Sequence, residues 1–169
     1  MPNLMICGYA RHGKDTVAEL LADYANMTFE SSSHFVAERL ILPALADKYG
    51  YKDAEECYQD RMNHRSEWFD LICEYNKDDP ARLSREIFKV HDMYVGIRNA
   101  KEFIAAREQG VCDLSIWVDA SQRHPPEGQD SNTIKSSMCD LVIENNHPLD
   151  VLKAKVKRLA GVINARFDQ

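Results

Sequence analysis

Short apolar runs alternate with amphipathic stripes along the whole chain. Five short runs are apolar enough for strands buried in a sheet, and they cover residues 3–7, 27–30, 93–97, 114–118 and 141–143. Between these runs, apolar residues recur at the three- and four-residue spacings of a helix. The first stripe consists of Val17, Leu20, Leu21 and Tyr24, and the last of Leu149, Leu152, Val156, Leu159 and Ile163. This alternation predicts an α/β fold in which a short parallel sheet of about five strands is covered by helices on both faces.

Two longer segments, residues 34–90 and 119–132, interrupt the simple alternation. Residues 34–48, 51–78 and 80–90 have helical patterns, and Pro43 is predicted to kink or interrupt the first of these helices. Residues 119–132 are polar and contain two prolines and a glycine, which suits a short lid-like flap. We find no internal repeat and no interdomain linker, so residues 1–169 are predicted to form one domain.

The segment "GYARHGKDT", residues 8–16, lies between the first predicted strand and the first predicted helix. It resembles the phosphate-loop pattern G-x-x-x-x-G-K-[ST], in the strand-to-helix position that this pattern requires. Backbone N–H groups and the dipole at a helix N-terminus attract phosphate, and the lysine adds a full positive charge. The residues predicted to contact a nucleotide phosphate are Gly8, Ala10, Arg11, His12, Gly13, Lys14, Asp15 and Thr16. For His12 we expect only the backbone N–H to matter.

Asp15 stands where the pattern has Ser or Thr, and Thr16 follows it. Carboxylate oxygens are suitable ligands for Mg²⁺, so we predict a magnesium site at Asp15 and Thr16, with Asp15 bound directly or through water and Thr16 bonding a phosphate oxygen. The alternative is that Asp15 only stabilises the first turn of a helix, as acidic residues do.

Composition narrows the possible partners. The chain is 44% hydrophobic and has a net charge of −6, which argues against non-specific nucleic-acid binding. No apolar run approaches the roughly 18 residues of a membrane span, and the motif at residue 8 leaves no room for a signal peptide. The five cysteines are odd in number and form no C-x-x-C pair, as in a reduced cytoplasmic protein.

Three stretches carry a resemblance to a known family. "GYARHGKDT" resembles the loop of bacteriophage deoxynucleoside monophosphate kinases, which are P-loop kinases of the adenylate-kinase-like fold. "YVGIRNAKE" (94–102) is similar to the family's strand that ends in an arginine followed by a glutamate, here Arg98 and Glu102. "CDLVIENNHPLDVLKAKV" (139–156) is similar to its last strand, Asn-containing loop and closing helix. The chain departs from the family at Gly96, where an acidic residue is common, and at Val36, where a lysine is common.

The resemblance implies ATP-dependent phosphorylation of a (deoxy)nucleoside monophosphate, with ATP and Mg²⁺ as cofactors. It also implies that Asn145 lines the donor adenine, with a helix-capping turn as the alternative. Residues 31–90 would then bind the acceptor, and 119–132 would close over the site. Partners would be limited to a small nucleotide, with no nucleic acid and no membrane, and a homodimer is possible.

Phosphoryl transfer mainly requires positioning and charge neutralisation, for which arginine is well suited. We predict that Lys14, Arg98 and Arg123 are catalytic, because Arg98 ends a strand and Arg123 lies in the flap. The residues predicted to bind the acceptor are Arg39, Arg65, Arg82, Arg85 and Trp68. Arg82 and Arg85 are three apart, so one helical face would let them hold one phosphate together. The alternatives are solvated or ion-paired arginines and a tryptophan in the core.

Two other functions remain open on the sequence alone. One is a kinase of another small phosphorylated metabolite or alcohol, similar to dephospho-coenzyme A, which would need a carboxylate beside the acceptor hydroxyl. The other is a non-catalytic nucleotide-binding module that retains the loop. Asp119 ends a predicted strand at the start of the flap, and it either orients Mg²⁺-bound water or caps a turn.

Overall fold

The computed structural model describes residues 1–126 and 132–167, and its five strands form one parallel sheet in the order β2-β3-β1-β4-β5. The strands are β1 (Leu4–Cys7), β2 (Phe29–Ser31), β3 (Met93–Val95), β4 (Leu114–Asp119) and β5 (Leu141–Glu144). The central strand β1 pairs with β3 on one side and β4 on the other, so that Leu4 lies opposite both Met93 and Leu114. The predicted five-stranded parallel sheet is confirmed.

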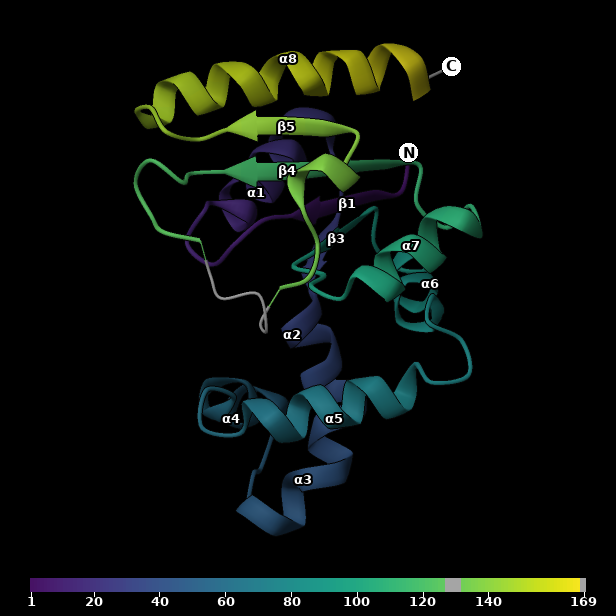
Figure 1. The fold of residues 1–169 in the computed structure, drawn as a ribbon. Helices are drawn as coiled ribbons and strands as arrows, with labels where there is room; N and C mark the ends of the chain where they lie inside the picture. The colour runs from purple at the N-terminus through teal and green to yellow at the C-terminus, as the bar shows by residue number, and fades with distance from the viewer. Residues whose placement is uncertain (127–131, 168–169) are drawn as a thin grey trace.

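Helices cover both faces of this sheet, as the hydrophobic pattern predicted (Figure 1). Leu4 and Ile6 of β1 pack with α1 (Lys14–Ala25) and α8 (Leu149–Phe167), which also contact each other. Met5 and Cys7 point to the opposite face, where α6 (Arg82–Phe88) and α7 (Ala100–Glu108) lie. The division follows from the two-residue period of a strand, which sends successive side chains to opposite faces.

A group of helices lies beyond one side of the sheet, below it in Figure 1. It consists of α2 (Ser32–Val36), a π-helical turn η1 (Ala37–Ile41), α3 (Leu42–Tyr49), α4 (Ala54–Asp60) and α5 (Arg65–Tyr75). The predicted interruption near Pro43 is the π-helical turn just before it, in which the Leu42 N–H donates to the Ala37 carbonyl five residues back. A proline ring crowds the preceding turn and donates no N–H, which favours a local widening of the helix.

The helical segment predicted over residues 51–78 is formed by two helices, α4 and α5. The chain turns at residues 61–64, where the backbone N–H and the side-chain amide of Asn63 donate to Asp60 at 2.9 and 2.6 Å. The Tyr51 hydroxyl donates to the same Asp60 carboxylate at 2.6 Å. These polar bonds offer the backbone an alternative to a continuous helix, although the segment contains neither proline nor glycine at the break.

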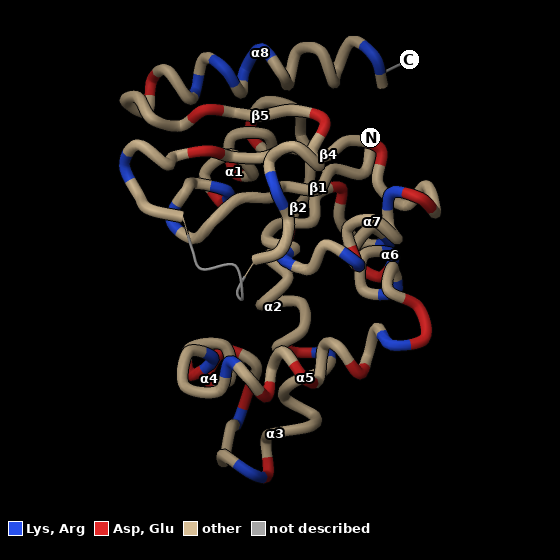
Figure 2. Tube along the Cα trace, viewed as in Figure 1, with Lys and Arg blue, Asp and Glu red and all other residues tan. Residues whose placement is uncertain are grey.

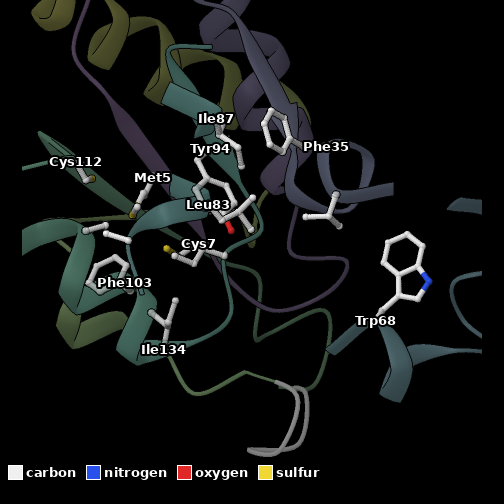
Figure 3. Packing of buried hydrophobic residues seen from close by; sticks show 14 of the residues in the cluster. Met5, Cys7, Phe35, Trp68, Leu83, Ile87, Tyr94, Phe103, Cys112 and Ile134 are labelled. Atoms are coloured by element: carbon white, nitrogen blue, oxygen red, sulfur yellow. The ribbon is translucent and has the colours of Figure 1, made fainter. Parts of the chain in front are cut away.

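One hydrophobic cluster connects the sheet to the outer helices (Figure 3). It runs from Cys7 and Tyr94 on the sheet through Phe35 to Trp68 of α5. The Trp68 side chain is only 5% exposed, so the structure favours its alternative role as a core residue over stacking on an acceptor base. Cluster continuity means that the outer helices and the sheet are packed as one body.

The cysteines and the apolar character of the helices bear on two sequence-based expectations. All five cysteines lie in the described ranges and carry free thiols. Contact with Cys139 and burial both raise the pKa of Cys7 well above its ordinary value, so its thiol is inert at the end of β1. In residues 1–126 and 132–167, no helix has the length and apolar character needed to cross a membrane.

Candidate nucleotide-binding site

The connection from β1 to α1 has the backbone shape of a phosphate loop. Gly8, Arg11 and Gly13 have φ values of 144°, 63° and 93°, in the region that favours glycine. A Cβ added at Gly8 would lie 2.6 Å from the Val118 carbonyl oxygen, and one at Gly13 would lie 2.5 Å from the Asn145 amide nitrogen. The two motif glycines are therefore required by both conformation and space.

The N-terminus of α1 opens directly onto this loop. The N-cap is Gly13, which has no side chain to bond the N–H groups of the first turn. The first N–H groups and the helix dipole are therefore directed at the loop. Lys14 is the first helical residue and is mostly buried, and its ammonium donates to the Tyr9 carbonyl at 2.8 Å. The loop thus combines backbone donors with a lysine charge held against it.

Asp15 and Thr16 lie in the first turn of α1, where Asp15 is exposed and Thr16 is half-buried. Within the described residues, no three His, Cys, Asp or Glu side chains are grouped so as to hold a metal ion. A metal at this position would therefore need phosphate oxygens to complete its ligands, as Mg²⁺ commonly does with nucleotides. The two oxygen-bearing side chains fit that requirement.

His12 plays a larger part than its backbone N–H, contrary to expectation. Its ring is fully buried, and its Nδ1 accepts a hydrogen bond from the Ala120 N–H at 2.9 Å. The proton therefore resides on Nε2, which donates to the His124 carbonyl at 3.3 Å. Nδ1 also lies 3.9 Å from an Asp119 carboxylate oxygen, but the bond from Ala120 identifies the ring as neutral, so we assign no ion pair there.

Asn145 lies beneath the loop, at the end of β5. Its side-chain amide donates to the His12 carbonyl at 2.9 Å, and its backbone N–H donates to the Asp119 carbonyl at 2.6 Å. The amide is buried and supports the loop from below. The contact with adenine that the resemblance implies stays a prediction, and the observed bonds give Asn145 a structural reason to be present.

Asn132 is a loop contact that the sequence did not reveal. Its side-chain amide donates to the Gly8 carbonyl at 3.4 Å, while its Oδ1 accepts the Ile134 N–H at 3.1 Å. The neighbouring Thr133 N–H donates to the Arg98 carbonyl at 3.0 Å. Residues 127–131 of the predicted flap lie outside the described residues, but both flanks of that segment are bound to the loop and to the strand ends.

The three predicted catalytic residues lie on connections at the same edge of the sheet. Lys14 follows β1, Arg98 follows β3 and Arg123 follows β4, and the carboxyl ends of these parallel strands meet at one edge. Figure 2 shows basic segments among the connections at this edge. Arg98 is half-buried and Arg123 is exposed. Asp15, Asp119 and Glu144 lie at the same edge, so the three cations are placed among carboxylates rather than in a uniformly positive patch.

The predicted acceptor arginines are arranged in two ways. Arg39 lies 4.3 Å from the Phe35 ring centroid, and Arg82 lies 3.9 Å from that of Tyr75. Three of these four side chains, all but Arg82, border a small depression. The depression is lined by Phe35, Val36, Arg39, Leu40, Tyr75, Leu83 and Glu86. At about 10 Å³ the depression is too small for a nucleobase, so it is a packing gap beside Arg39.

Arg85 does not join Arg82 on a common target. Arg85 forms an ion pair with Asp79 and donates to Gln109, whereas Arg82 lies over Tyr75 with its Nε 3.6 Å from Glu86. The prediction that both hold one phosphate does not match this arrangement, because local carboxylates already occupy each guanidinium. Arg65 begins α5 and is exposed.

The remaining strand-end residues have local structural roles. The Asp119 carboxylate accepts hydrogen bonds from the Ser121 hydroxyl at 3.0 Å and its N–H at 3.3 Å, which favours the turn-capping alternative. Gly96, where an acidic residue is common in the kinase family that the sequence resembles, has a φ of 93° and donates its N–H to the Ile6 carbonyl. Burial raises the pKa of Glu102, which lies in the first turn of α7.

Comparison with known proteins identifies the fold. No protein-family model matches the sequence, and no curated protein sequence matches it. The structure is similar to shikimate kinase from Bacteroides thetaiotaomicron, with a TM-score of 0.52 and 11% identity over 95% of this chain and 97% of that one. Shikimate kinase from Aquifex aeolicus vf5 gives 0.48, with 14% identity over 96% and 97%. An unliganded sugar kinase from Janibacter sp. HTCC2649 gives 0.49, with 13% identity over 96% and 95%. The chain thus has a P-loop NTPase fold like that of shikimate kinase.

Proposed function

We propose that this protein transfers a phosphoryl group from ATP to a deoxynucleoside monophosphate, giving ADP and the deoxynucleoside diphosphate. The single observation that carries the proposal is the loop at residues 8–16. It joins a central parallel strand to a helix, its glycines have positive φ, and Lys14 lies at its mouth. This combination provides the backbone donors and the charge that a triphosphate requires.

The donor site would use the loop amides and Lys14 for the β- and γ-phosphates of ATP. Asp15 and Thr16 supply the oxygen ligands next to it, and Mg²⁺, when bound, would neutralise charge on the transferring phosphoryl group. Arg98 and Arg123 come from neighbouring strand ends and would offset the repulsion between donor and acceptor anions. Each of these residues positions or neutralises a group, which is what phosphoryl transfer mainly requires.

We infer that the acceptor is a nucleoside monophosphate from the types of residue on the outer helices. A nucleoside 5′-phosphate has a second pKa of about 6 and is largely a dianion at neutral pH, so it needs no general base. It needs cations for the phosphate and a flat apolar surface for the base. The exposed Arg39 and Arg65 of the outer helices offer such cations, whereas Phe35 is buried and Arg82 lies beside Glu86. The resemblance to bacteriophage deoxynucleoside monophosphate kinases supports the same class.

A second candidate is phosphorylation of a small non-nucleotide metabolite. It is favoured by the fold similarity to a protein named shikimate kinase and by the partly exposed Asp119 carboxylate at the end of β4. An acceptor hydroxyl needs a carboxylate to take its proton. The bonds from Ser121 to that carboxylate count against this role, because they direct its oxygens toward the turn.

The deciding experiment incubates the purified protein with ATP, Mg²⁺ and each of the four deoxynucleoside monophosphates. ADP and deoxynucleoside diphosphate are measured separately, with shikimate and dephospho-coenzyme A as parallel acceptors. Equal amounts of ADP and diphosphate are expected with at least one nucleotide. ADP alone would indicate an ATPase, and product only with a hydroxyl acceptor would establish the second candidate. No product and ATP binding alone would indicate a nucleotide-binding module.

Lys14→Ala tests the donor site directly. We expect it to lower kcat by at least about 100-fold, in the range typical of losing one electrostatic contact to the transition state. The matched control is Lys153→Ala, on an exposed position of α8, which should leave kcat unchanged. Full activity in the Lys14 variant would contradict the proposed donor site.

A further inference from the structure

We propose that the His12 side chain is a positioning residue that fixes the turn Ala120–His124, and with it Arg123, against the phosphate loop. This inference rests on the proposed function, in which Arg123 acts on the transferring phosphoryl group. It assigns to His12 a role that the phosphate-loop pattern does not, because that pattern specifies no side chain at this position.

One imidazole ring holds both ends of the turn. The Ala120 N–H donates to Nδ1 at 2.9 Å, and Nε2 donates to the His124 carbonyl at 3.3 Å. A neutral imidazole has one donor and one acceptor nitrogen on a rigid ring, so it satisfies two backbone groups that a single amide or hydroxyl of this size would not span. The ring is fully buried, which raises the cost of leaving either backbone group unpaired.

The turn itself is closed and has a further tether. The N–H groups of Arg123 and His124 both donate to the Ala120 carbonyl at 2.9 Å. The Gln122 N–H donates to the Asn146 side chain at 3.1 Å. The turn that carries Arg123 is therefore tied at Ala120 and His124 by the His12 ring and at Gln122 by Asn146.

The loop in turn fixes the imidazole. The His12 main-chain carbonyl accepts a hydrogen bond from the Asn145 side-chain amide at 2.9 Å. The His12 ring meets the Tyr9 ring edge-on at a centroid distance of 5.4 Å. The main-chain carbonyl of Tyr9 accepts a hydrogen bond from the Lys14 ammonium. Movement of the phosphate loop thus moves the imidazole, and the imidazole carries the turn that bears Arg123.

The first test replaces the ring with side chains that keep part of its function. His12→Leu removes both bonds, whereas His12→Asn keeps an acceptor close to the Nδ1 position. We expect kcat to fall about tenfold or more in the Leu variant, as for loss of a buried hydrogen bond, with less than about a twofold change in KM for ATP. The Asn variant should recover part of kcat. A purely structural role would not give this recovery.

The second test asks whether His12 acts through Arg123. If it does, His12→Leu should lower kcat much less in an Arg123→Ala background than in the wild-type protein. Equal losses in the two backgrounds would show that the two residues act independently and would overturn the proposal. His91→Leu is the matched control, because His91 precedes β3 at the opposite edge of the sheet and bonds Glu30 there at 3.1 Å.

The third test is independent of catalysis. Amide hydrogen exchange of peptides that cover residues 120–124 should be fastest in His12→Leu, intermediate in His12→Asn, which keeps only the bond to Ala120, and close to wild type in His91→Leu. Unchanged exchange in His12→Leu would overturn the clamp. If His12→Leu does not fold, the comparison of His12→Asn with wild type decides, since only the His124 bond is then lost. If the wild-type protein phosphorylates no acceptor, the proposed function fails and this exchange measurement still tests the clamp.

Discussion

Replacement of Gly8 by alanine should be among the most damaging single-methyl changes in this protein. Gly8 has a φ of 144°, and holding a side-chain-bearing residue in such a region costs about 1–3 kcal/mol. The added Cβ would also lie 2.6 Å from the Val118 carbonyl oxygen, about 0.8 Å closer than the 3.4 Å of ordinary contact. Because this oxygen belongs to the backbone of β4, it cannot rotate away.

The strand must therefore shift, and overpacking of this kind costs about 1–3 kcal/mol. We expect Gly8→Ala to lower the free energy of unfolding by about 2–6 kcal/mol, the sum of the two effects. Gly50→Ala separates them, because Gly50 also has positive φ, at 75°, but has open space around its Cβ position. That variant should lose only about 1–2 kcal/mol.

Urea unfolding followed by circular dichroism measures both variants, and titration calorimetry with ATP and Mg²⁺ measures the loop. Gly8→Ala should lose ATP binding, whereas Gly50→Ala, at the end of α3, should keep it. The reasoning is refuted if the two variants lose equal stability, since the contact with Val118 would then have no energetic effect.

Two further predictions concern Asp140, at the amino ends of β4 and β5, and Asn145, beside the phosphate loop. Burial opposes ionisation of Asp140, but hydrogen bonds from Arg107 and Ser115 outweigh it and lower the pKa of Asp140 to about 2. Because this carboxylate is about one-third exposed, Asp140→Asn should cost about 1–2 kcal/mol at pH 7, less than the full pKa shift implies. The pKa of Asp140 in the folded state is lower than its unfolded value of 3.8. The difference in free energy of unfolding between wild type and variant should therefore vanish as pH falls from about 4 to about 2. A difference that stays constant over this range in urea unfolding would contradict the assignment. Asn145→Ala leaves the His12 carbonyl without its partner and should cost about 1–3 kcal/mol while weakening ATP binding in calorimetry. Unchanged ATP affinity would show that the loop keeps its shape without this amide.

The parts of the fold that follow local rules were predictable from the sequence. The apolar run that forms β1 and the apolar spacings along α1 and α8 predicted the sheet and its covering helices, because burial on a strand or helix has a fixed period. Pro43 predicted its interruption by its missing N–H. The break between α4 and α5 was not predictable, since it depends on Asp60 accepting bonds from Tyr51 and Asn63.

The site was predictable only where backbone shape requires particular residues. Gly8 and Gly13 mark the loop because no side chain fits there. His12 and Asn132 make contacts 112 and 124 residues away, and no spacing rule connects such partners. Arg82 and Arg85 share a helical spacing, but their local carboxylates draw them apart, which spacing alone does not reveal.

The strand order has a consequence for synthesis. The central strand β1 is translated before both of its neighbours, because β3 begins only at Met93 and β4 only at Leu114. The last support of the loop, Asn145, is translated later still. Such distant pairing must overcome a large loop-closure entropy before any contact forms. The phosphate loop is therefore translated well before the elements that shape it, and a nascent chain that stops before β5 carries the motif without the structure that makes it a binding site.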